Sequence, residues 1–244
     1  MDQQIALITG GAKGIGRGIA LDLAARHWRV ALCYRHSDAE ANATAQDIVA
    51  RGGQPLAIRC DVSDPVAAKN LIAKVEQEWG RIDVLINGAG PYHRINLFDE
   101  TVEGWNEMFA GNLHPIFYLA QAVAPGMKAR KAGRIINFSM ANADQMEAQP
   151  DVTGHYIAKA GVLILTRTLA KLLAPYGITV NAISPGFIDS GSAPPQELAA
   201  MTKRIPAGYI GTIEDTVGAV RYLLSDDARY VNGANIQISG GWGI

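Results

Sequence analysis

Short apolar, β-branched runs alternate along the whole chain with longer segments whose apolar residues recur at helical spacing. The runs predict seven strands, at residues 5–9, 29–34, 55–59, 84–86, 134–138, 179–183 and 235–239. The segments between them predict helices over 15–27, 39–51, 64–79, 103–130, 155–175 and 213–224. Strands that alternate with helices of this length form right-handed crossover units, so we expect a three-layer α/β Rossmann fold. Its seven-stranded parallel sheet would carry helices on both faces.

Composition narrows the class of protein further. The 244 residues are 48% hydrophobic and show no linker or shift in composition, so we expect one domain over 1–244. With 22 basic and 23 acidic side chains, the net charge of −1 leaves no surplus field for nucleic acid or a membrane surface. The first residues show no targeting pattern, which favours a cytoplasmic location. Cys33 and Cys60 have no metal-ligand spacing, so we expect two buried free thiols and no metal.

A glycine-rich turn follows the first predicted strand. It runs from Thr9 to Gly16, with Gly10, Gly14 and Gly16 at the point where the first helix begins. Glycines let the backbone approach a pyrophosphate closely, and a helix N-terminus presents unpaired N–H groups to the anion. Glycines at such a turn can also serve packing alone, but the strand, the helix and a second feature agree here. The turn therefore predicts a dinucleotide site.

The second feature lies at the end of the second strand. An Asp or Glu there normally accepts hydrogen bonds from the adenosine ribose of NAD, whereas this chain has Tyr34, Arg35 and His36. The planar donors of Arg35, together with Lys13 in the glycine turn, suit a 2′-phosphate. The alternative is that both are ordinary solvated cations. We expect NADP(H) to be preferred over NAD(H).

The spacing Thr-Gly-x-x-x-Gly-x-Gly resembles the short-chain dehydrogenase/reductase family, and further landmarks follow in order along the whole chain. Asp61-Val62 resembles the adenine-binding pair, and Asn87-Gly88-Ala89-Gly90 resembles the Asn-Asn-Ala-Gly turn with the second Asn replaced. Pro185 to Ser190 is similar to the segment that meets the nicotinamide amide. Within the family, residues 205–208 and a short substrate loop resemble the 3-oxoacyl carrier-protein reductases.

The resemblance implies a set of contacts to the cofactor and a set of catalytic positions. The implied cofactor residues are Gly10, Lys13, Gly14, Ile15, Gly16, Arg35, Asp61, Val62, Asn87, Ala89, Gly90, Lys159, Pro185, Gly186, Ile188 and Ser190. Asn112 matches the Asn that holds a proton-relay water. In the family a Tyr protonates the substrate oxygen, a Lys four residues later binds the nicotinamide ribose, and a Ser polarises the carbonyl.

The catalytic pattern departs from the family at two positions. The residue four before Lys159 is His155, and Tyr156 is only three before it. On a helix, these two neighbours lie about 100° apart around the axis. The usual Ser position holds Met140, and its neighbour Ser139 should point to the opposite face of the strand unless the backbone bulges.

Three hypotheses follow. Tyr156 is the acid, brought into place by a shifted helix start; or His155 takes over proton transfer; or the chain binds NADP(H) without catalysis, as a sensor or scaffold. The segment between Met140 and Gly154 is two or three residues longer than in the related reductases. Polar substitutes for the Ser are available there and nearby: Ser139, Asn142, Asp144 and Thr153.

The leading hypothesis is an NADP(H)-dependent oxidoreductase that moves hydride between the nicotinamide and a carbonyl or alcohol substrate, in the manner of a 3-oxoacyl reductase. The substrate pocket is expected near Tyr92, His93, Met146, Phe187 and the loop of the 190s. Four consecutive apolar residues at 162–165 predict burial on two sides of one helix, hence a homodimer or homotetramer, or else a fully internal helix.

A basic cluster stands where one predicted helix ends and the next strand begins. It consists of Lys128, Arg130, Lys131 and Arg134. Cations at a helix C-terminus complement the helix dipole, which is one explanation. The resemblance supplies the other, an acidic acyl carrier protein as partner.

Overall fold

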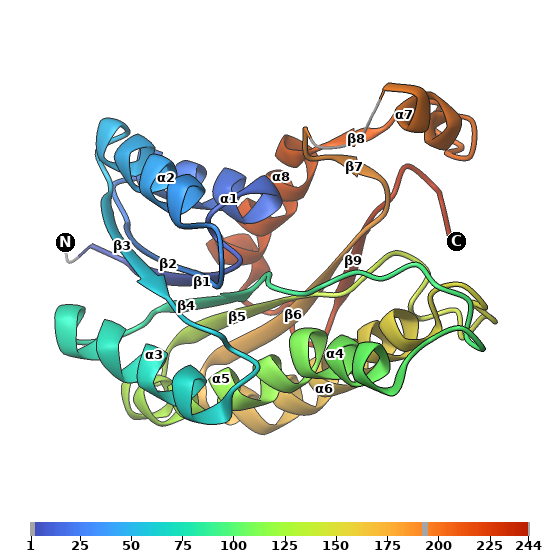
Figure 1. Cartoon of the computed structure of the whole chain (residues 1–244). Helices are drawn as coiled ribbons and strands as arrows, with labels where there is room; N and C mark the ends of the chain where they lie inside the picture. The colour runs from blue at the N-terminus through green and yellow to red at the C-terminus, as the bar shows by residue number, and fades with distance from the viewer. Residues whose placement is uncertain (1–2, 192–194, 244) are drawn as a thin grey trace.

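Seven parallel strands form the central sheet of the computed structural model, which describes residues 3–191 and 195–243 (Figure 1). The strands are β1 (Ile5–Thr9), β2 (Arg29–Tyr34), β3 (Gln54–Arg59), β4 (Val84–Asn87), β5 (Gly133–Phe138), β6 (Ile178–Pro185) and β9 (Asn235–Ile238). Their spatial order is β3-β2-β1-β4-β5-β6-β9, and every neighbouring pair is parallel. The predicted Rossmann sheet is confirmed.

Helices cover both faces of the sheet, as Figure 1 shows. One layer holds α1 (Gly14–Ala25), α2 (Asp38–Ala50) and α8 (Ile213–Leu224); the other holds α3 (Pro65–Trp79), α4 (Val102–Asn112), α5 (His114–Arg130) and α6 (Thr153–Leu173). Short 3-10 turns, η1 (Ala174–Tyr176) and η2 (Asp226–Ala228), precede β6 and β9. No helix in the described part of the chain is long and apolar enough to cross a membrane.

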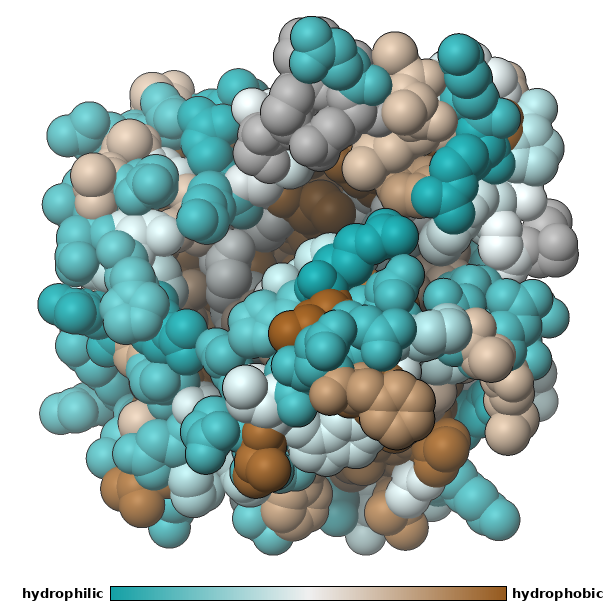
Figure 2. Space-filling model, turned by 45° about the vertical axis from the view of Figure 1, so that its right-hand side comes forward, coloured by the Kyte–Doolittle hydropathy of each residue, from teal (hydrophilic) through white to brown (hydrophobic). Residues whose placement is uncertain are grey.

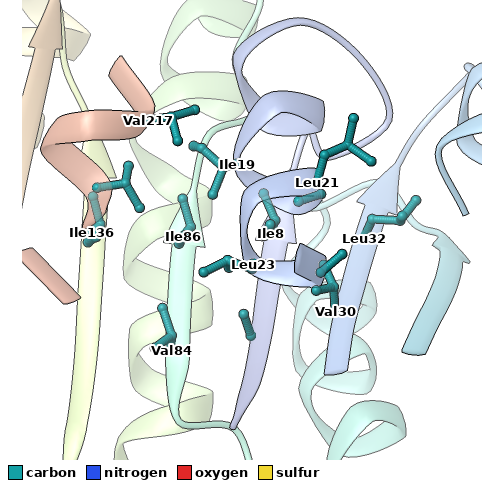
Figure 3. Packing of buried hydrophobic residues seen from close by; sticks show 14 of the residues in the cluster. Ile8, Ile19, Leu21, Leu23, Val30, Leu32, Val84, Ile86, Ile136 and Val217 are labelled. Atoms are coloured by element: carbon teal, nitrogen blue, oxygen red, sulfur yellow. The ribbon is translucent and has the colours of Figure 1, made fainter. Parts of the chain in front are cut away.

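The strands are continuous apolar runs because both of their faces are buried. Along β1, Ala6 and Ile8 pack into the cluster under α1 and α8, whereas Ile5 and Leu7 pack into the cluster on the α3 and α5 side. Figure 3 shows the first cluster, where Ile8 lies beside Ile86 of β4. This packing fixes the register of the strand ends, where the site is built.

Two expectations about elements were wrong. The single helix predicted over 103–130 is divided at Leu113 into α4 and α5, because Pro115 in the first turn of α5 has no N–H to continue the α4 hydrogen bonds. No strand was predicted between 183 and 235, but this interval contains β7 (Ile188–Asp189), which pairs with β8 (Gly211–Thr212); α7 (Pro195–Thr202) follows the loop of the 190s. Residues 192–194 of that loop lie outside the described residues.

The strand order reverses between β1 and β4. The chain proceeds outward from β1 to β2 and β3, then returns to β4 on the other side of β1. In open α/β sheets, the carboxyl ends of the strands at such a switch point form a crevice. With this edge turned toward the viewer, the space-filling view shows a hollow across the molecule (Figure 2).

Candidate functional site

A groove of about 660 Å³ lies at this switch point, between the ends of β1, β2 and β4 and the turns that follow them. Most of the residues that we expected to bind cofactor line it: Gly10, Lys13, Gly14, Ile15, Gly16, Arg35, Asp61, Val62, Ala89, Gly90 and Ser190. The fold therefore brings together residues from several separate turns. Sequence reasoning missed further lining residues that adjoin these: Ala12, Cys33, Tyr34, His36, Ser37, Cys60, Ser63, Gly88, Pro91 and Gly111.

The other expected cofactor residues are not among those that line the groove: Asn87, Lys159, Pro185, Gly186 and Ile188. Asn87 donates from Nδ2 to Oδ1 of Asn137 at 2.8 Å, inside the sheet. The backbone of Pro185 and Gly186 is engaged with neighbouring segments, since Pro185 O accepts from Ala141 N and Gly186 N donates to Ile238 O. Ile188 is half-buried in β7.

The glycine turn has the geometry of an anion cradle. Gly10 and Gly14 adopt φ of +70° and +55°, in the left-handed region where glycine carries no Cβ penalty. A Cβ on Gly16 would collide with the carbonyl oxygen of Gly10. Helix α1 begins at Gly14 with no acidic side chain in its first turn, so its N–H groups and positive dipole end are not neutralised. These features fit the pyrophosphate of a dinucleotide.

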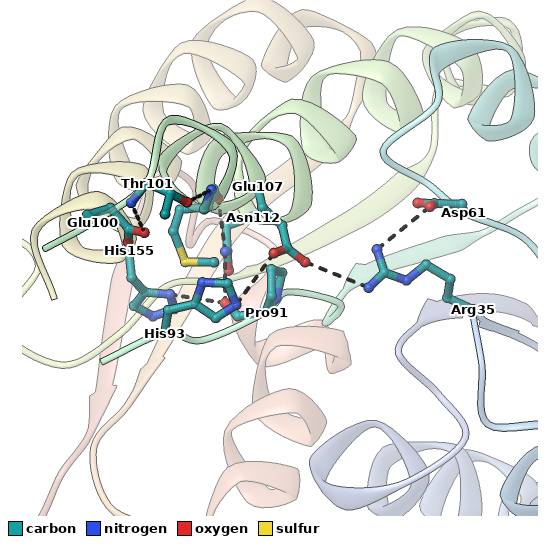
Figure 4. A network of polar contacts seen from close by, with 11 residues as sticks. Arg35, Asp61, Pro91, His93, Glu100, Thr101, Glu107, Asn112 and His155 are labelled. Atoms are coloured by element: carbon teal, nitrogen blue, oxygen red, sulfur yellow. Dashed lines mark hydrogen bonds and ion pairs between the residues drawn. The ribbon is translucent and has the colours of Figure 1, made fainter. Parts of the chain in front are cut away.

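Arg35 stands at the rim of the groove in a network of weak ion pairs (Figure 4). Its guanidinium lies 3.7 Å from Asp61 and 3.8 Å from Glu107 of α4, and Glu107 also lies 3.5 Å from Nε2 of His93. These side chains are about half exposed, so each pair contributes little to stability and exchanges partners readily. Sequence reasoning missed Glu107, because nothing along the chain connects α4 to the end of β2.

Tyr156 is buried, 6% exposed, and its hydroxyl is committed to the backbone. The hydroxyl donates to the carbonyl of Asn142 at 2.7 Å and accepts from the N–H of Glu147 at 3.0 Å. Asn142 has φ of +60°. The tyrosine therefore anchors the extended segment after β5, and its proton is already used.

His155 directly precedes Tyr156 and reaches the turn after β4. Its Nδ1 lies 3.2 Å from the carbonyl oxygen of Pro91, which also accepts from Nδ2 of Asn112 at 3.0 Å. Because a carbonyl only accepts, Nδ1 carries the proton and Nε2 has a free lone pair. Burial and the neighbouring charge of Lys159 lower the pKa of His155 to about 4, so the ring is neutral near pH 7.

Lys159 lies one turn further along α6 and is buried. Its Nζ donates to the carbonyl of Phe138 at 2.9 Å, and burial lowers the pKa of Lys159 to about 8. A Cβ added to Gly90 would collide with Oδ1 of Asn112 and stand 3.5 Å from Nζ of Lys159. Gly90 on the groove wall therefore adjoins both side chains. Oδ1 of Asn112 is buried and accepts no hydrogen bond from the residues that the structure describes.

The usual Ser position carries no hydroxyl. Met140 is half-buried against Ala143, Leu163 and Ala182, while the hydroxyl of Ser139 donates to the carbonyl of Lys159 at 2.8 Å. Ser139 thus points into α6, as strand alternation predicts.

The other polar substitutes are engaged or buried. Thr153 donates to Gln149 O, and the carboxylate of Asp144 accepts from Asn235 and Gln237. Asn142 Oδ1 is buried and accepts no hydrogen bond in 3–191 or 195–243.

Comparisons with known proteins agree on the family. A family model described as Enoyl-(Acyl carrier protein) reductase matches residues 10–243. The chain is 35% identical over 239 residues to a 3-oxoacyl-[acyl-carrier-protein] reductase of Synechocystis, covering 98% of this chain and 96% of that protein. It is 36% identical over 242 residues to an acetoacetyl-CoA reductase of Rhizobium meliloti, covering 98% of each.

A solved structure, a short-chain type dehydrogenase/reductase from Mycobacterium marinum, superposes with a TM-score of 0.91 at 33% identity, covering 98% of this chain and 95% of that one. Matches of this length and identity cover the glycine turn, the groove and helix α6 together. The chain belongs to the short-chain dehydrogenase/reductase family of oxidoreductases.

Proposed function

We propose that the protein is an NADP(H)-dependent oxidoreductase that moves hydride between the nicotinamide and a carbonyl or alcohol, with His155 as the proton-transfer group. The observation that carries the proposal is the placement of two neighbours on α6. His155 stands four residues before Lys159 and shares the Pro91 carbonyl with Asn112, whereas the Tyr156 hydroxyl is bonded to Asn142 and Glu147.

The groove supplies a binding residue for each end of the cofactor. The glycine turn would hold the pyrophosphate, and Arg35 with Lys13 would hold the 2′-phosphate through charge-assisted hydrogen bonds. Lys159 would bind the nicotinamide ribose from the far side of Gly90. When bound, the nicotinamide supplies or accepts the hydride. Every other step falls to the side chains of this protein.

The tautomer of His155 defines its part in the reaction. In alcohol oxidation, the carbon gives up hydride while the free Nε2 lone pair takes the hydroxyl proton; in reduction, Nε2–H returns that proton to the carbonyl oxygen. The Pro91 carbonyl holds Nδ1–H throughout, as an oriented acceptor does for a catalytic histidine. Because burial and Lys159 disfavour the imidazolium, the proton is returned readily.

The substrate is proposed to be a small carbonyl or alcohol, with 3-oxoacyl thioesters first among candidates because two relatives bear names of reductases for such compounds. Phe187 packs against Trp242, with ring centroids 4.7 Å apart and ring planes inclined at 50°. Phe187 and the exposed Tyr92 and Met146 all follow the carboxyl ends of strands, at the same edge of the sheet. With Met140 in place of a hydroxyl, the carbonyl oxygen has one donor fewer than in the family pattern.

The acyl carrier protein remains a proposed partner, but the basic cluster gives it no support. Arg134 lies in β5 just after its first residue, and Lys128 and Arg130 lie at the end of α5. The groove is at the opposite edge of the sheet, where the strands end. A carrier bound at this cluster would hold its acyl chain at the wrong edge.

A second candidate function is NADP(H) binding without turnover. It is favoured by Met140 and by the inward hydrogen bond of Ser139, which together leave no hydroxyl at the usual carbonyl-polarising position. Calorimetry with NADPH, followed by NADPH oxidation with 3-oxoacyl thioesters and simple ketones, separates the two. Binding with turnover supports the oxidoreductase, binding without turnover supports the sensor or scaffold, and absence of binding refutes both.

A further inference from the structure

The two cysteines of the chain, 27 residues apart in sequence, meet at the floor of the cofactor groove. Cys33 in β2 pairs in register with Ile58 of β3, and Cys60 follows Ile58 by two residues. Side chains two apart on a strand share a face, so both thiols lie on the same side of the sheet. Cys33 is buried and Cys60 is half-buried, and both line the groove.

The two cysteine side chains are neighbours across β2 and β3. Sγ of Cys33 donates to the carbonyl oxygen of Cys60 at 3.6 Å, and Sγ of Cys60 donates to the carbonyl oxygen of Ala67 at 3.5 Å. The neighbouring Cys33 side chain lowers the pKa of Cys60, whereas the Cys60 side chain and burial raise the pKa of Cys33. The more exposed sulfur is therefore also the better thiolate, and the thiol beside it is buried and protonated.

The backbone of both cysteines holds the walls of the groove. The carbonyl of Cys33 accepts from the N–H of Gly10 at 2.9 Å and of Gly11 at 3.3 Å, so it positions the glycine turn. The N–H of Cys60 donates to Tyr34 O at 2.8 Å, immediately before Asp61. A covalent bond between the two sulfurs would pull on the pyrophosphate end and the adenine end of the groove together.

We propose that Cys33 and Cys60 are a redox-sensitive pair: hydrogen peroxide oxidises them to a disulfide, and the disulfide weakens cofactor binding. The Cys60 thiolate attacks the peroxide O–O bond, forming Cys60 sulfenic acid and releasing water after protonation of the leaving oxygen. The Cys33 thiol then attacks this sulfur, the S–S bond forms and the S–O bond breaks, with release of a second water. Two thiols and one peroxide thus yield one disulfide and two waters. The effect on binding rests on the proposed cofactor site.

Intact-mass measurement on the reduced protein tests the chemistry. With hydrogen peroxide we expect a loss of about 2 Da that dithiothreitol reverses, and a cross-linked pair of peptides containing Cys33 and Cys60. Saturating NADPH should suppress the reaction, because the cofactor covers the groove that both sulfurs line. In Cys33→Ser, Cys60 should gain about 16 Da and then more, because no thiol is present to resolve the sulfenic acid.

Calorimetry tests the effect of the disulfide on cofactor binding. The disulfide form should bind NADPH at least about tenfold more weakly than the reduced form, with affinity restored by dithiothreitol. If Cys33→Ser folds poorly, alkylation of the unmodified protein by iodoacetamide tests which thiol is more reactive. Cys60 should be alkylated first, and NADPH should protect it.

Three results would overturn the proposal: no mass loss while free glutathione is oxidised, a disulfide with unchanged NADPH affinity, or faster alkylation of Cys33 than of Cys60. A reduced protein that does not bind NADPH would refute the proposed function instead, and the mass change would still decide the disulfide.

Discussion

The Tyr156 hydroxyl donates a 2.7 Å hydrogen bond to the carbonyl oxygen of Asn142, 14 residues earlier in the chain. This bond joins the first turn of α6 to the segment that replaces the usual loop after β5. It gives the tyrosine a part in stability, while its neighbour His155 is directed to the Pro91 carbonyl.

Replacing Tyr156 by Phe should therefore reduce mainly the stability of the protein and have little effect on its turnover. The change leaves the Asn142 carbonyl and the Glu147 N–H without their buried partner, which should cost about 1 to 3 kcal/mol in the free energy of unfolding. Urea denaturation measures this loss. Turnover per folded molecule should fall by less than about threefold, and a loss near that of an acid–base variant would restore Tyr156 as the proton donor.

His155→Gln is expected to remove turnover and spare cofactor binding. A glutamine fills similar space but does not exchange a proton near neutral pH, so kcat should fall about 100-fold to 10,000-fold with an unchanged Kd for NADPH. Stopped-flow turnover and calorimetry give the two values. Full activity in both this variant and Tyr156→Phe would exclude both residues and direct the search to Asn142, Asp144 and Thr153.

The buried side chains of His155 and Lys159 should make the free energy of unfolding depend on pH in two separate windows. The pKa of His155 is lowered from 6.5 to about 4, so between pH 4 and 6.5 His155 is protonated in the unfolded chain but not in the folded chain. Stability should fall as pH falls from 6.5 toward 4. The pKa of Lys159 is lowered from 10.5 to about 8, so from pH 8 to 10.5 the folded protein releases a proton that the unfolded chain keeps. Stability from this group should rise across that window.

Unfolding free energies measured across both windows check this prediction. His155→Gln should flatten the acidic window. Lys159→Met should flatten the alkaline window and also weaken the acidic one, because the charge of Lys159 helps to lower the pKa of His155. Turnover provides a second check, since alcohol oxidation should not lose rate between about pH 7 and 5, where an ordinary histidine would become protonated. A rate that halves near pH 6.5 would contradict the lowered pKa.

Cofactor preference should depend on Arg35 and its carboxylate partner. Arg35→Ala should weaken NADPH by roughly 10- to 100-fold and leave NADH nearly unchanged, because only the 2′-phosphate loses charge-assisted hydrogen bonds. Glu107→Gln is the matched variant: it removes a carboxylate 3.8 Å from the guanidinium, so NADPH should bind more tightly. Calorimetry with both cofactors measures this, and equal affinity of the unmodified protein for NADPH and NADH would refute the NADP(H) assignment.

The outer surface of α5 and α6 predicts self-association. Phe117, Ile157, Ile164 and Leu172 are exposed, with Ile164 at 66% and Leu172 at 62%. Of the four apolar residues at 162–165, Val162 and Leu163 face inward and Ile164 faces out. Light scattering should give a dimer or tetramer of the 26.0 kDa chain, and Ile164→Lys should dissociate it. A monomer at micromolar concentration would contradict the prediction.

The sequence by itself determined the sheet, the glycine turn and most of the groove. Strand and helix periods are properties of consecutive residues, and the turns after β1, β2, β3 and β4 meet at one edge because the strands are parallel. Even the displaced catalytic pattern was visible, since it is a spacing between His155, Tyr156 and Lys159.

Only the tertiary structure decided where those side chains point. Neighbouring residues on α6 are rotated by about 100° around the helix axis, but the sequence does not show which partner each side chain then contacts. The partner of His155 is a carbonyl 64 residues away, and that of Tyr156 is on a segment whose path is set by its own turns. The contacts between Glu107 and Arg35, and between Cys60 and Cys33, likewise join separate elements. Periodicity predicts such elements but not which of them lie side by side. Local patterns specify elements, whereas contacts between them depend on packing over the whole sheet.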